Sequence, residues 1–316
     1  MAKGLKVTMV GAGGFIGASL AERFARTDTL CVVDRTHRLQ RLGHLPDNVR
    51  RVTWEPDDEM TRLHDTLVAT DVLISLAWTS QPAQSMTGMV GDARQNIVRS
   101  LELFQYAAER GVDRIVFASS GGTVYGNVDQ VPTPETTPLM PVSAYGVSKM
   151  AVERYLDLIS YHYGVTGISL RIGNPYGPYQ LAGLSIGLIA NFLLRAVEGE
   201  PLRLFGDGET VRDYVWIEDL AAAVEAVSRT PGLSAGAYNV GSGVGHSIND
   251  VATMVEGHFP RLGPRIYEKG RAFDAMRSVL DTTKLRQATG WAITRSIEDG
   301  IAEMKEHALR GIGARS

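Results

Sequence analysis

The feature that most constrains the fold lies near the start of the chain, where an apolar segment runs into three regularly spaced glycines. Residues 5–10 are mostly apolar and typical of a buried strand, and a helical stretch follows at 18–26. Between them the pattern G-x-x-G-x-x-G places Gly11, Gly14 and Gly17. Glycines at this spacing allow a tight turn, and the helix N-terminus then offers free N–H groups to a phosphate. The segment therefore predicts a dinucleotide-binding turn.

Strand-like and helix-like segments alternate through the first half of the chain. Further strands are expected at residues 30–34, 49–54, 71–77, 114–119 and 165–172, and helices at 90–110 and 145–163. Strands that alternate with helices form a parallel sheet with helices on both faces, so the sequence predicts a doubly wound α/β Rossmann fold.

After about residue 175, glycine and proline break this alternation into short segments. Helices are expected at 184–199, at 247–258 and after Ser296, which is well placed to cap the last helix. We expect a dinucleotide-binding Rossmann domain at residues 1–174, to which later segments return, and a smaller lobe at 175–316.

The composition excludes several classes of protein. Of 316 residues, 44% are hydrophobic and 21% charged, and the net charge of −3 gives no general attraction to nucleic acid or an anionic membrane. No apolar stretch approaches the ~20 residues that span a bilayer. The glycine motif comes too early for a signal peptide. The single cysteine, Cys31, fits a buried thiol in the cytoplasm, and the scattered histidines predict no metal site.

Acidic residues follow two of the expected strands. Asp34 ends the segment 30–34, where a carboxylate accepts hydrogen bonds from a ribose 2′-hydroxyl and repels a 2′-phosphate, which favours NAD over NADP. The adjacent Arg35 is a further candidate for cofactor binding, and it weakens that preference. Asp57 is expected either to reach the adenine or to lie in a solvated loop.

Tyr145 and Lys149 lie one helical turn apart on the same face of the expected helix at 145–163. A phenol with a pKa near ~10 is a poor base at neutral pH, but a nearby ammonium or a positive nicotinamide lowers that pKa. The tyrosinate can then take a proton from a sugar hydroxyl as its carbon loses hydride. The pair therefore predicts a catalytic base, given its place after the fifth strand.

In its ordered motifs the chain resembles the extended short-chain dehydrogenase/reductases, specifically the NAD-dependent nucleotide-sugar epimerase/dehydratase group. The resemblance runs from Val7 to about Ile301 and includes GAGGFIG (11–17), SSGGTVYG (119–126), YGVSK (145–149) and NPYGP (174–178). It implies NAD as the cofactor, a nucleotide-sugar substrate, and a homodimer that pairs the helices at 90–110 and 145–163 into a four-helix bundle.

The resemblance also implies roles for individual residues. The cofactor contacts it implies, beyond Asp34, Arg35, Asp57 and the Tyr145/Lys149 pair, are Gly11, Gly14, Phe15, Ile16, Gly17, Leu76, Ala77, Asn96 and Ser119. The substrate contacts it implies are Asn174 and Arg212 at the diphosphate, Phe205 at the base, and Arg271 and Asp274 at phosphate and ribose. Phe273 replaces a usual glycine, which predicts a different backbone there. Taken singly, each arginine could instead form a surface salt bridge, and Asn96 could be a solvated helix residue.

One further position bears on the sugar. Ser278 falls where related 4-epimerases carry a gate residue, and its small side chain favours N-acetylhexosamines.

The loop after the fifth strand lacks an expected hydroxyl. Where family epimerases place Ser or Thr, and dehydratases begin a T-D-E triad, this chain has Gly121-Gly-Thr123 and no carboxylate, so dehydration is disfavoured. Residues 119, 121 and 123 share a face if the strand stays extended. We therefore expect Thr123 to supply the catalytic hydroxyl, and Ser119 and Ser120 to line the nicotinamide pocket. The alternative is that Thr123 is a structural loop hydroxyl.

The sequence thus predicts an NAD-dependent nucleotide-sugar 4-epimerase that acts on a UDP-hexose or UDP-N-acetylhexosamine through a transient 4-keto sugar. The alternatives are a 4-ketoreductase, another sugar-nucleotide epimerase and, outside enzymes, an NAD-binding regulator of the same fold. Asp34 disfavours the reductase, and the retained Tyr145 and Lys149 disfavour the regulator.

Overall fold

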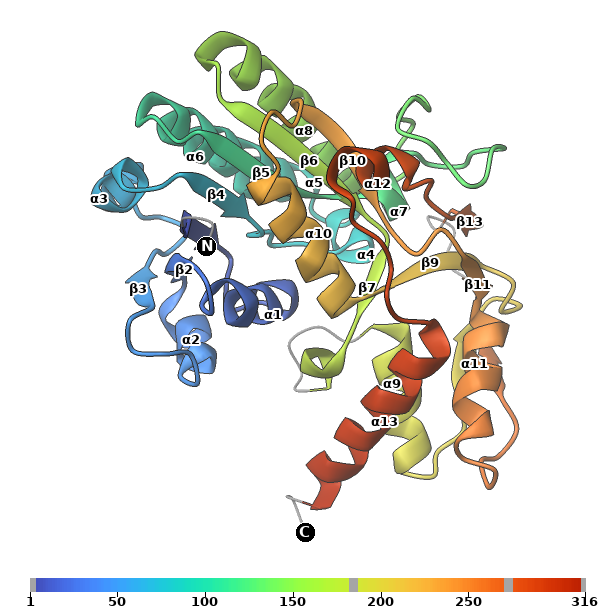
Figure 1. The fold of residues 1–316 in the computed structure, drawn as a ribbon. Helices are drawn as coiled ribbons and strands as arrows, with labels where there is room; N and C mark the ends of the chain where they lie inside the picture. The colour runs from blue at the N-terminus through green and yellow to red at the C-terminus, as the bar shows by residue number, and fades with distance from the viewer. Residues whose placement is uncertain (1–3, 182–186, 270–274, 314–316) are drawn as a thin grey trace.

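A seven-stranded parallel sheet forms the centre of the molecule (Figure 1). The computed structural model describes residues 4–181, 187–269 and 275–313. The strands of this sheet are β1 (Lys6–Val10), β2 (Thr29–Asp34), β3 (Arg50–Thr53), β4 (Val72–Ser75), β5 (Arg114–Ser120), β6 (Thr166–Ile172) and β10 (Gly236–Val240). They lie in the order β10-β6-β5-β4-β1-β2-β3, and every neighbouring pair is parallel. The expected doubly wound α/β Rossmann fold is confirmed.

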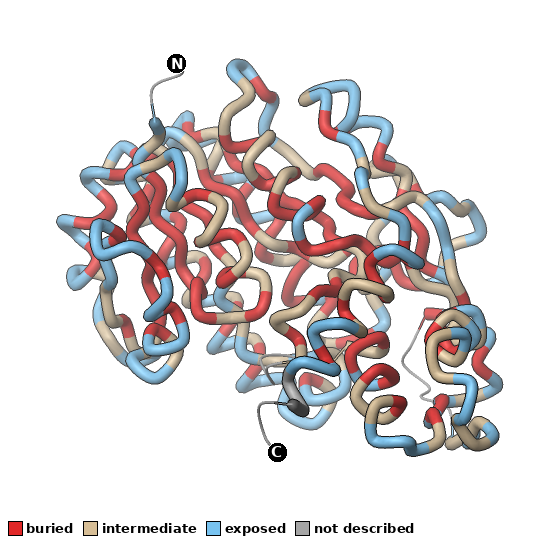
Figure 2. The backbone as a smooth tube through the Cα atoms, turned by 60° about the horizontal axis from the view of Figure 1, so that its bottom comes forward, coloured by how far each residue is buried: buried red, intermediate tan, exposed pale blue. Residues whose placement is uncertain are grey.

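Helices cover both faces of the sheet, because successive strand residues point to opposite sides. In β2, Val32 belongs to the buried cluster that includes helices α1 and α10, and the next residue, Val33, to the cluster that includes α6 and α8. The helices of these layers are α1 (Phe15–Phe24), α10 (Ile217–Arg229), α3 (His64–Val68), α6 (Arg99–Glu109) and α8 (Ala144–Tyr163). Figure 2 shows the buried backbone concentrated in the strands and in the helices that face them.

Short elements connect these layers near the ends of the strands. They are α2 (Thr36–Leu39), η1 (Gln40–Leu42), η2 (Met60–Leu63), α4 (Pro82–Ser85), α5 (Met89–Asp92), η3 (Ala93–Val98) and α7 (Gly121–Val124). The expected helix at 90–110 is therefore three consecutive pieces, α5, the π-helical η3 and α6. The segment after β5 turns into α7 and does not stay extended.

A smaller lobe follows β6. Its elements are β7 (Asn174–Tyr176), η4 (Pro178–Gln180), α9 (Leu188–Val197), β8 (Arg203–Phe205), β9 (Val211–Trp216), β11 (Gly245–Ser247), α11 (Ile248–Gly257), β12 (Ile266–Glu268), β13 (Arg277–Ser278), α12 (Thr283–Thr289) and α13 (Ile297–Gly313). β7, β9, β11 and β13 form one small sheet, and β8 pairs with β12 in another. Within this stretch α10 and β10 return to the large sheet, while a division of the chain at residue 174 stays a prediction.

Three local expectations can be compared directly. Ser296 caps α13, since its hydroxyl accepts from the Asp299 N–H at 3.1 Å. Cys31 is buried, and burial raises the pKa of its thiol to about 11. In the part of the chain that the structure describes, no helix combines the length and apolar character needed to cross a bilayer.

Candidate active site

A cleft of about 870 Å³ opens where the carboxyl ends of β1, β4 and β5 meet. The strand order changes direction between β1 and β4, and such switch points are where open parallel sheets bind ligands. The expected cofactor residues that line the cleft are Gly11, Gly14, Phe15, Ile16, Gly17, Leu76, Ser119, Tyr145 and Lys149. The glycine motif and the pair Tyr145 and Lys149 therefore share one hollow, although they lie about 130 positions apart in the chain.

The glycine loop is too tightly packed for side chains. Gly11 has a φ of +88°, and a Cβ there would lie 2.5 Å from the Ala77 nitrogen. A Cβ on Gly17 would lie 2.5 Å from the Ala12 carbonyl oxygen. Gly14 is the N-cap of α1 and supplies no side-chain cap, so the first N–H groups of this helix remain available to a ligand.

Asp34 supports this loop from behind. Its carboxylate accepts from the Gly13 N–H at 2.9 Å and from the Arg35 N–H at 2.8 Å, and the residue is 7% exposed. Neither Asp34 nor Arg35 is among the cleft-lining residues, whereas Arg38, which the sequence reasoning missed, is one. Burial lowers the pKa of Arg38, and Asp34 opposes that change. The contacts expected of Asp34 and Arg35 with a ribose stay predictions.

Three more expected cofactor residues, Ala77, Asp57 and Asn96, lie outside the cleft lining. Asp57 is exposed in the turn after β3. Asn96 is 3% exposed and lies behind the cleft wall, where it accepts from the Thr79 N–H at 3.0 Å and donates to Asp92 at 3.0 Å. Asn96 is therefore no solvated helix residue. The Ser80 hydroxyl, on the wall itself, also donates to Asp92.

Tyr145 and Lys149 lie in the first turns of α8, and both line the cleft. Ser143 caps this helix by accepting from the Gly146 N–H at 3.2 Å. The Lys149 ammonium donates to the Ala118 carbonyl at 2.6 Å and lies 5.6 Å from the centre of the Tyr145 ring. The helical spacing therefore brings phenol and ammonium together beside the end of β5.

Burial dominates the protonation of both groups. It raises the pKa of Tyr145 to about 12, a hydrogen bond with Ser120 opposes the rise, and Asp92 adds to it. Burial also lowers the pKa of Lys149 well below its usual value, although Glu153 and Asp92 oppose this. A further positive charge near the Tyr145 ring is therefore needed before the phenol can act as a base near neutral pH.

The hydroxyl that hydrogen-bonds Tyr145 belongs to Ser120, the last residue of β5. The strand ends there and residues 121–124 are helical, so the expected alternation from Ser119 to Thr123 is wrong. Thr123 nevertheless lines a pocket together with Tyr145. Its hydroxyl is buried and has no hydrogen-bond partner among the described residues. A catalytic role for Thr123 therefore stays a prediction, and Ser120 joins it as a second hydroxyl.

The two glycines of this loop have different surroundings. A Cβ on Gly121 would lie 2.6 and 2.8 Å from the two methyl carbons of Leu280. A Cβ on Gly122 would meet Asn174 Oδ1 at 3.7 Å and Ser278 Oγ at 3.9 Å, which are ordinary contacts. Leu280 thus fills the space that a hydroxyl-bearing residue at position 121 would need.

A smaller pocket of about 280 Å³ meets the large cleft at Tyr145. The two hollows share residues from both lobes, namely Ser120, Tyr145, Gly173, Asn174, Pro175 and Arg212. The other residues that line the small pocket are Pro82, Gly122, Thr123, Gly126, Val142, Ser143 and Ala275. None of these described residues is Asp or Glu.

Three of the expected substrate residues lie together in the large cleft. Those that line the cleft are Asn174, Phe205 and Arg212. The Arg212 guanidinium donates to the carbonyls of Val211 and Ala275 at 3.0 and 2.7 Å. Ser278 is 8% exposed and its hydroxyl lies 3.5 Å from the Gly121 carbonyl oxygen, just behind the small pocket. Arg271 and Asp274 lie outside the described residues.

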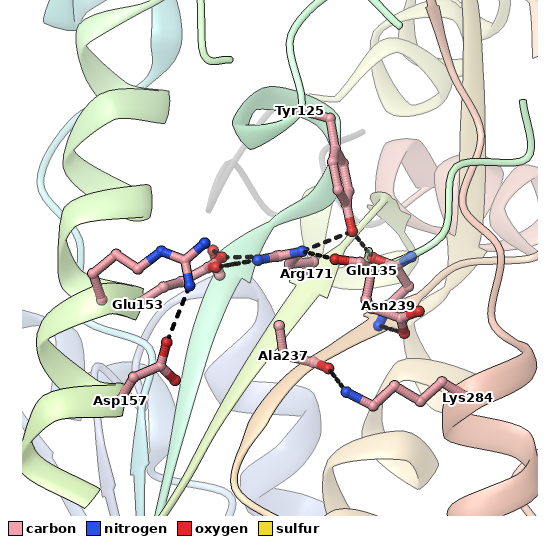
Figure 3. Close-up of polar contacts among 10 residues, drawn as sticks. Tyr125, Glu135, Glu153, Asp157, Arg171, Ala237, Asn239 and Lys284 are labelled. Carbon is pink, nitrogen blue, oxygen red and sulfur yellow. Dashed lines mark hydrogen bonds and ion pairs between the residues drawn. The ribbon is translucent and has the colours of Figure 1, made fainter. Parts of the chain in front are cut away.

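A buried ion pair joins β6 to α8 (Figure 3). Arg171 of β6 and Glu153 of α8 meet through two nitrogens, with Nη2–Oε2 at 2.7 Å and Nε–Oε1 at 3.2 Å, and both side chains are almost completely buried. Arg171 also donates to the Tyr125 hydroxyl at 3.0 Å. The Ser119 hydroxyl donates to Glu153, so it belongs to this network although Ser119 lines the cleft.

Comparisons with known proteins agree over nearly the whole chain. Residues 7–241 match the model of the NAD dependent epimerase/dehydratase family. The chain is 31% identical over 311 residues to a UDP-glucose 4-epimerase of Mycolicibacterium smegmatis, covering 96% of this chain and 98% of that relative. It is 29% identical over 304 residues to a dTDP-4-dehydro-6-deoxyglucose reductase of Escherichia coli, covering 94% and 96%. The solved structure of the Thermus thermophilus UDP-glucose 4-epimerase in complex with NAD superposes with a TM-score of 0.85 at 31% identity, covering 96% and 99%.

Proposed function

Since the chain belongs to the NAD dependent epimerase/dehydratase family, we propose that it is a nucleotide-sugar 4-epimerase that acts on a UDP-hexose or a UDP-N-acetylhexosamine. The observation that carries the proposal is the place of Tyr145, which lines both the large cleft and the small pocket. A base at that junction faces the glycine loop on one side and Asn174 and Arg212 on the other. It stands between a dinucleotide site and a sugar-diphosphate site.

NAD is the cofactor of this family, and the residues present fit it. The glycine loop is a cradle that side chains at Gly11 and Gly17 would fill, and it leads into the uncapped N-terminus of α1, which suits a pyrophosphate. Two cleft-lining residues also carry buried polar atoms without a partner among the described residues, Trp78 Nε1 and Gln180 Oε1. When bound, NAD supplies the acceptor for the hydride removed from the sugar and a positive ring beside Tyr145.

The residues of this chain would manage the proton. Tyr145 would remove the proton of the sugar 4-hydroxyl as C4 is oxidised to a carbonyl, and it would return the proton when C4 is reduced from its opposite face. Proton and hydride are both restored, so the sugar is inverted at C4 without net oxidation. The hydrogen bond from Ser120 stabilises the phenolate, and a positive charge on Lys149 would stabilise it further. Thr123 lines the small pocket, and its hydroxyl has no partner among the described residues, which supports a contact between Thr123 and the sugar.

The lobe residues would fix the nucleotide half of the substrate. Asn174 and Arg212 are proposed at the diphosphate and Phe205 at the base, because all three line the same cleft. A planar guanidinium suits a diphosphate. Arg271 and Asp274 keep their proposed roles from the family resemblance alone. Ser278 is proposed to leave room for an N-acetyl group, since it lies against the glycines that border the small pocket.

We also propose that two copies pair through α8 and the adjoining η3–α6 segment, in the cytoplasm. Exposed apolar side chains gather there, namely Val98, Val147, Tyr155, Leu158 and Tyr161. The helices α6 and α8 lie side by side on one face of the sheet (Figure 1). The compartment is proposed because the single cysteine is buried and free.

A 4-ketoreductase remains the second candidate, and one observation favours it. Arg38 lines the cleft near the glycine loop, whereas Asp34 does not, so a guanidinium is available to a 2′-phosphate. A reductase releases its cofactor at every turnover, whereas an epimerase regenerates and retains it. Retention of cofactor therefore separates the two.

The test is to incubate the purified protein with UDP-N-acetylglucosamine, without added cofactor, and to follow the sugar by proton NMR. We expect the galacto epimer to appear, and we expect Tyr145→Phe to abolish the conversion while it keeps the far-ultraviolet circular dichroism of the wild type. If the protein converted UDP-glucose but not UDP-N-acetylglucosamine, the proposal that Ser278 leaves room for an N-acetyl group would be wrong. Inertness toward both sugars, together with NADPH-dependent reduction of a 4-keto sugar nucleotide, would replace the epimerase with the reductase.

A further inference from the structure

Three aromatic rings surround the ammonium of Lys149. Its Nζ lies 3.6 Å from the ring centre of Trp78, 4.7 Å from that of Phe117 and 5.6 Å from that of Tyr145. The rings also contact one another, since the Trp78 ring centre lies 5.7 Å from that of Tyr145 and 6.0 Å from that of Phe117. Trp78, Phe117 and Tyr145 are called the aromatic cage below.

The charged groups that face Lys149 already have other partners. Glu153, one turn further along α8, is paired with Arg171 of β6. Asp92, at the end of α5, accepts hydrogen bonds from the hydroxyl groups of Ser80 and Ser148 and from the Asn96 amide. An ammonium has three N–H donors, and the hydrogen bond described for Lys149 is the one to Ala118. The faces of the aromatic rings therefore supply part of the negative environment that a buried ammonium needs.

Trp78 is the cage member whose ring lies closest to the ammonium. It lies three residues after the end of β4 and lines the cleft. Its indole Nε1 is buried without a hydrogen-bond partner among the described residues, so packing and the ammonium are what hold the ring. Tryptophan is also the side chain whose ring face attracts cations most strongly.

We propose that Trp78 is a positioning residue, which holds the charged form of Lys149 against its ring face and so keeps that charge beside Tyr145. The contribution of this charge to catalysis rests on the proposed function, but the contact between Trp78 and Lys149 does not. The indole acts through Lys149, and it is not assigned to the reacting atoms.

The experiment measures the titration of Lys149 itself. The chain contains only six lysines, Lys3, Lys6, Lys149, Lys269, Lys284 and Lys305, so labelling lysine with ¹³C at the ε carbon gives few signals. The signal that is missing from a Lys149→Arg variant belongs to Lys149. Its chemical shift is followed against pH in the wild type, in Trp78→Phe and in Trp78→Leu, at matched cofactor content and without substrate.

The ring face of Trp78 stabilises only the charged form of Lys149. Its loss must therefore lower the pH at the midpoint of the Lys149 titration. A cation–π contact of the usual strength corresponds to a fall of roughly 0.4–1.5 pH units in Trp78→Leu, with Trp78→Phe between that variant and the wild type. A midpoint that stays unchanged or rises in both variants overturns the proposal. If Trp78→Leu does not fold, biosynthetic incorporation of 5-fluorotryptophan weakens the ring face at nearly constant shape and must lower the midpoint in the same direction.

Trp54 provides the matched control. Its ring also carries a cation, with the Arg99 guanidinium carbon 4.4 Å from the ring centre, and its Nε1 is likewise buried and unpaired among the described residues. Trp54 does not line the cleft. Trp54→Phe must leave the midpoint of the Lys149 titration unchanged. If Trp54→Phe shifted this midpoint as much as Trp78→Phe does, the shift would follow from the loss of any indole and not from the contact between Trp78 and Lys149. Because no substrate is present, the titration stays readable even if the protein is no epimerase.

Discussion

Two hydroxyls lie near Tyr145, and they come from different elements. Ser120 ends β5 and hydrogen-bonds the phenol, which holds down its pKa, whereas Thr123 lies in α7 with its hydroxyl unpaired among the described residues. Loss of the Ser120 hydroxyl raises the pKa of Tyr145, so a higher pH is needed for the phenolate. We expect Ser120→Ala to lower kcat at pH 7 by roughly 10–100-fold, which is the range for a hydrogen bond to a charged group. We expect the acid limb of the pH–kcat profile to move upward as well.

Thr123→Val is the matched comparison, because it removes a hydroxyl from the same loop without touching that bond. If Thr123 contacts the sugar, KM rises or kcat falls with no movement of the acid limb. If the acid limb of the pH–kcat profile moved in Thr123→Val and not in Ser120→Ala, then Thr123 would be the residue that hydrogen-bonds Tyr145, and Ser120 the residue that contacts the sugar. The measurement is a full pH profile of kcat and KM for both variants.

Residues fixed by local spacing were predictable from the sequence, and residues fixed by tertiary contacts were not. The glycine loop, Tyr145 and Lys149 follow from patterns a few positions long. The bond of Ser120 depends on the residue at which β5 ends, and periodicity does not locate that end. The places of Trp78 and Arg38 depend on neighbours that are distant in the chain.

At the scale of elements, the turn from β5 into α7 decides which side chains this loop tolerates. A methyl group on Gly121 meets the buried Leu280 at 2.6 Å, and such overpacking costs about 1–3 kcal/mol. A methyl group on Gly122 finds ordinary contacts and restricts the unfolded chain, which stabilises by up to about 1 kcal/mol. We therefore expect Gly121→Ala to be less stable than Gly122→Ala in urea unfolding.

The two variants also differ in their effect on the site. The methyl group of Gly122→Ala borders the small pocket near Asn174, so we expect KM for the nucleotide sugar to rise while the fold is preserved. Equal unfolding midpoints for both variants would contradict the different surroundings of the two glycines.

Element boundaries show the same limit of sequence reasoning. The helix α10, at residues 217–229, was not expected, because it lies among Gly- and Pro-rich segments that indicated a separate lobe, although it packs beside α1 on the large sheet. The expected helix at 90–110 is interrupted by η3, whose π-helical turn carries the buried Asn96. Both α10 and η3 are defined by contacts with residues that are distant in the chain, and local sequence patterns do not reveal these contacts.

At the scale of the whole molecule, most of the parallel sheet was predictable because β1, β2, β4, β5 and β6 are short apolar runs that need cover on both faces. The strand β3 is not an apolar run, and β10 was not among the expected strands. The arrangement of the second lobe was not predictable, since its strands are short and pair across long stretches of chain. β9, for instance, pairs with β7, β11 and β13.

The outer face of α8 offers the last prediction. Tyr155, Leu158 and Tyr161 lie at three-residue spacing on one side of the helix and are 44%, 58% and 90% exposed. Exposed apolar side chains that gather on one side of a helix are typical of a protein interface. We expect sedimentation velocity at micromolar concentration to give twice the mass of one chain for the wild type, and Leu158→Lys to give the mass of one chain, because a lysine at the centre of an apolar interface must be desolvated. Val68→Lys is the control, since Val68 is 57% exposed but lies on α3, and it should leave the dimer intact. A wild type that sediments as a single chain would refute the dimer, and a Leu158→Lys variant that stays dimeric would move the interface to another face.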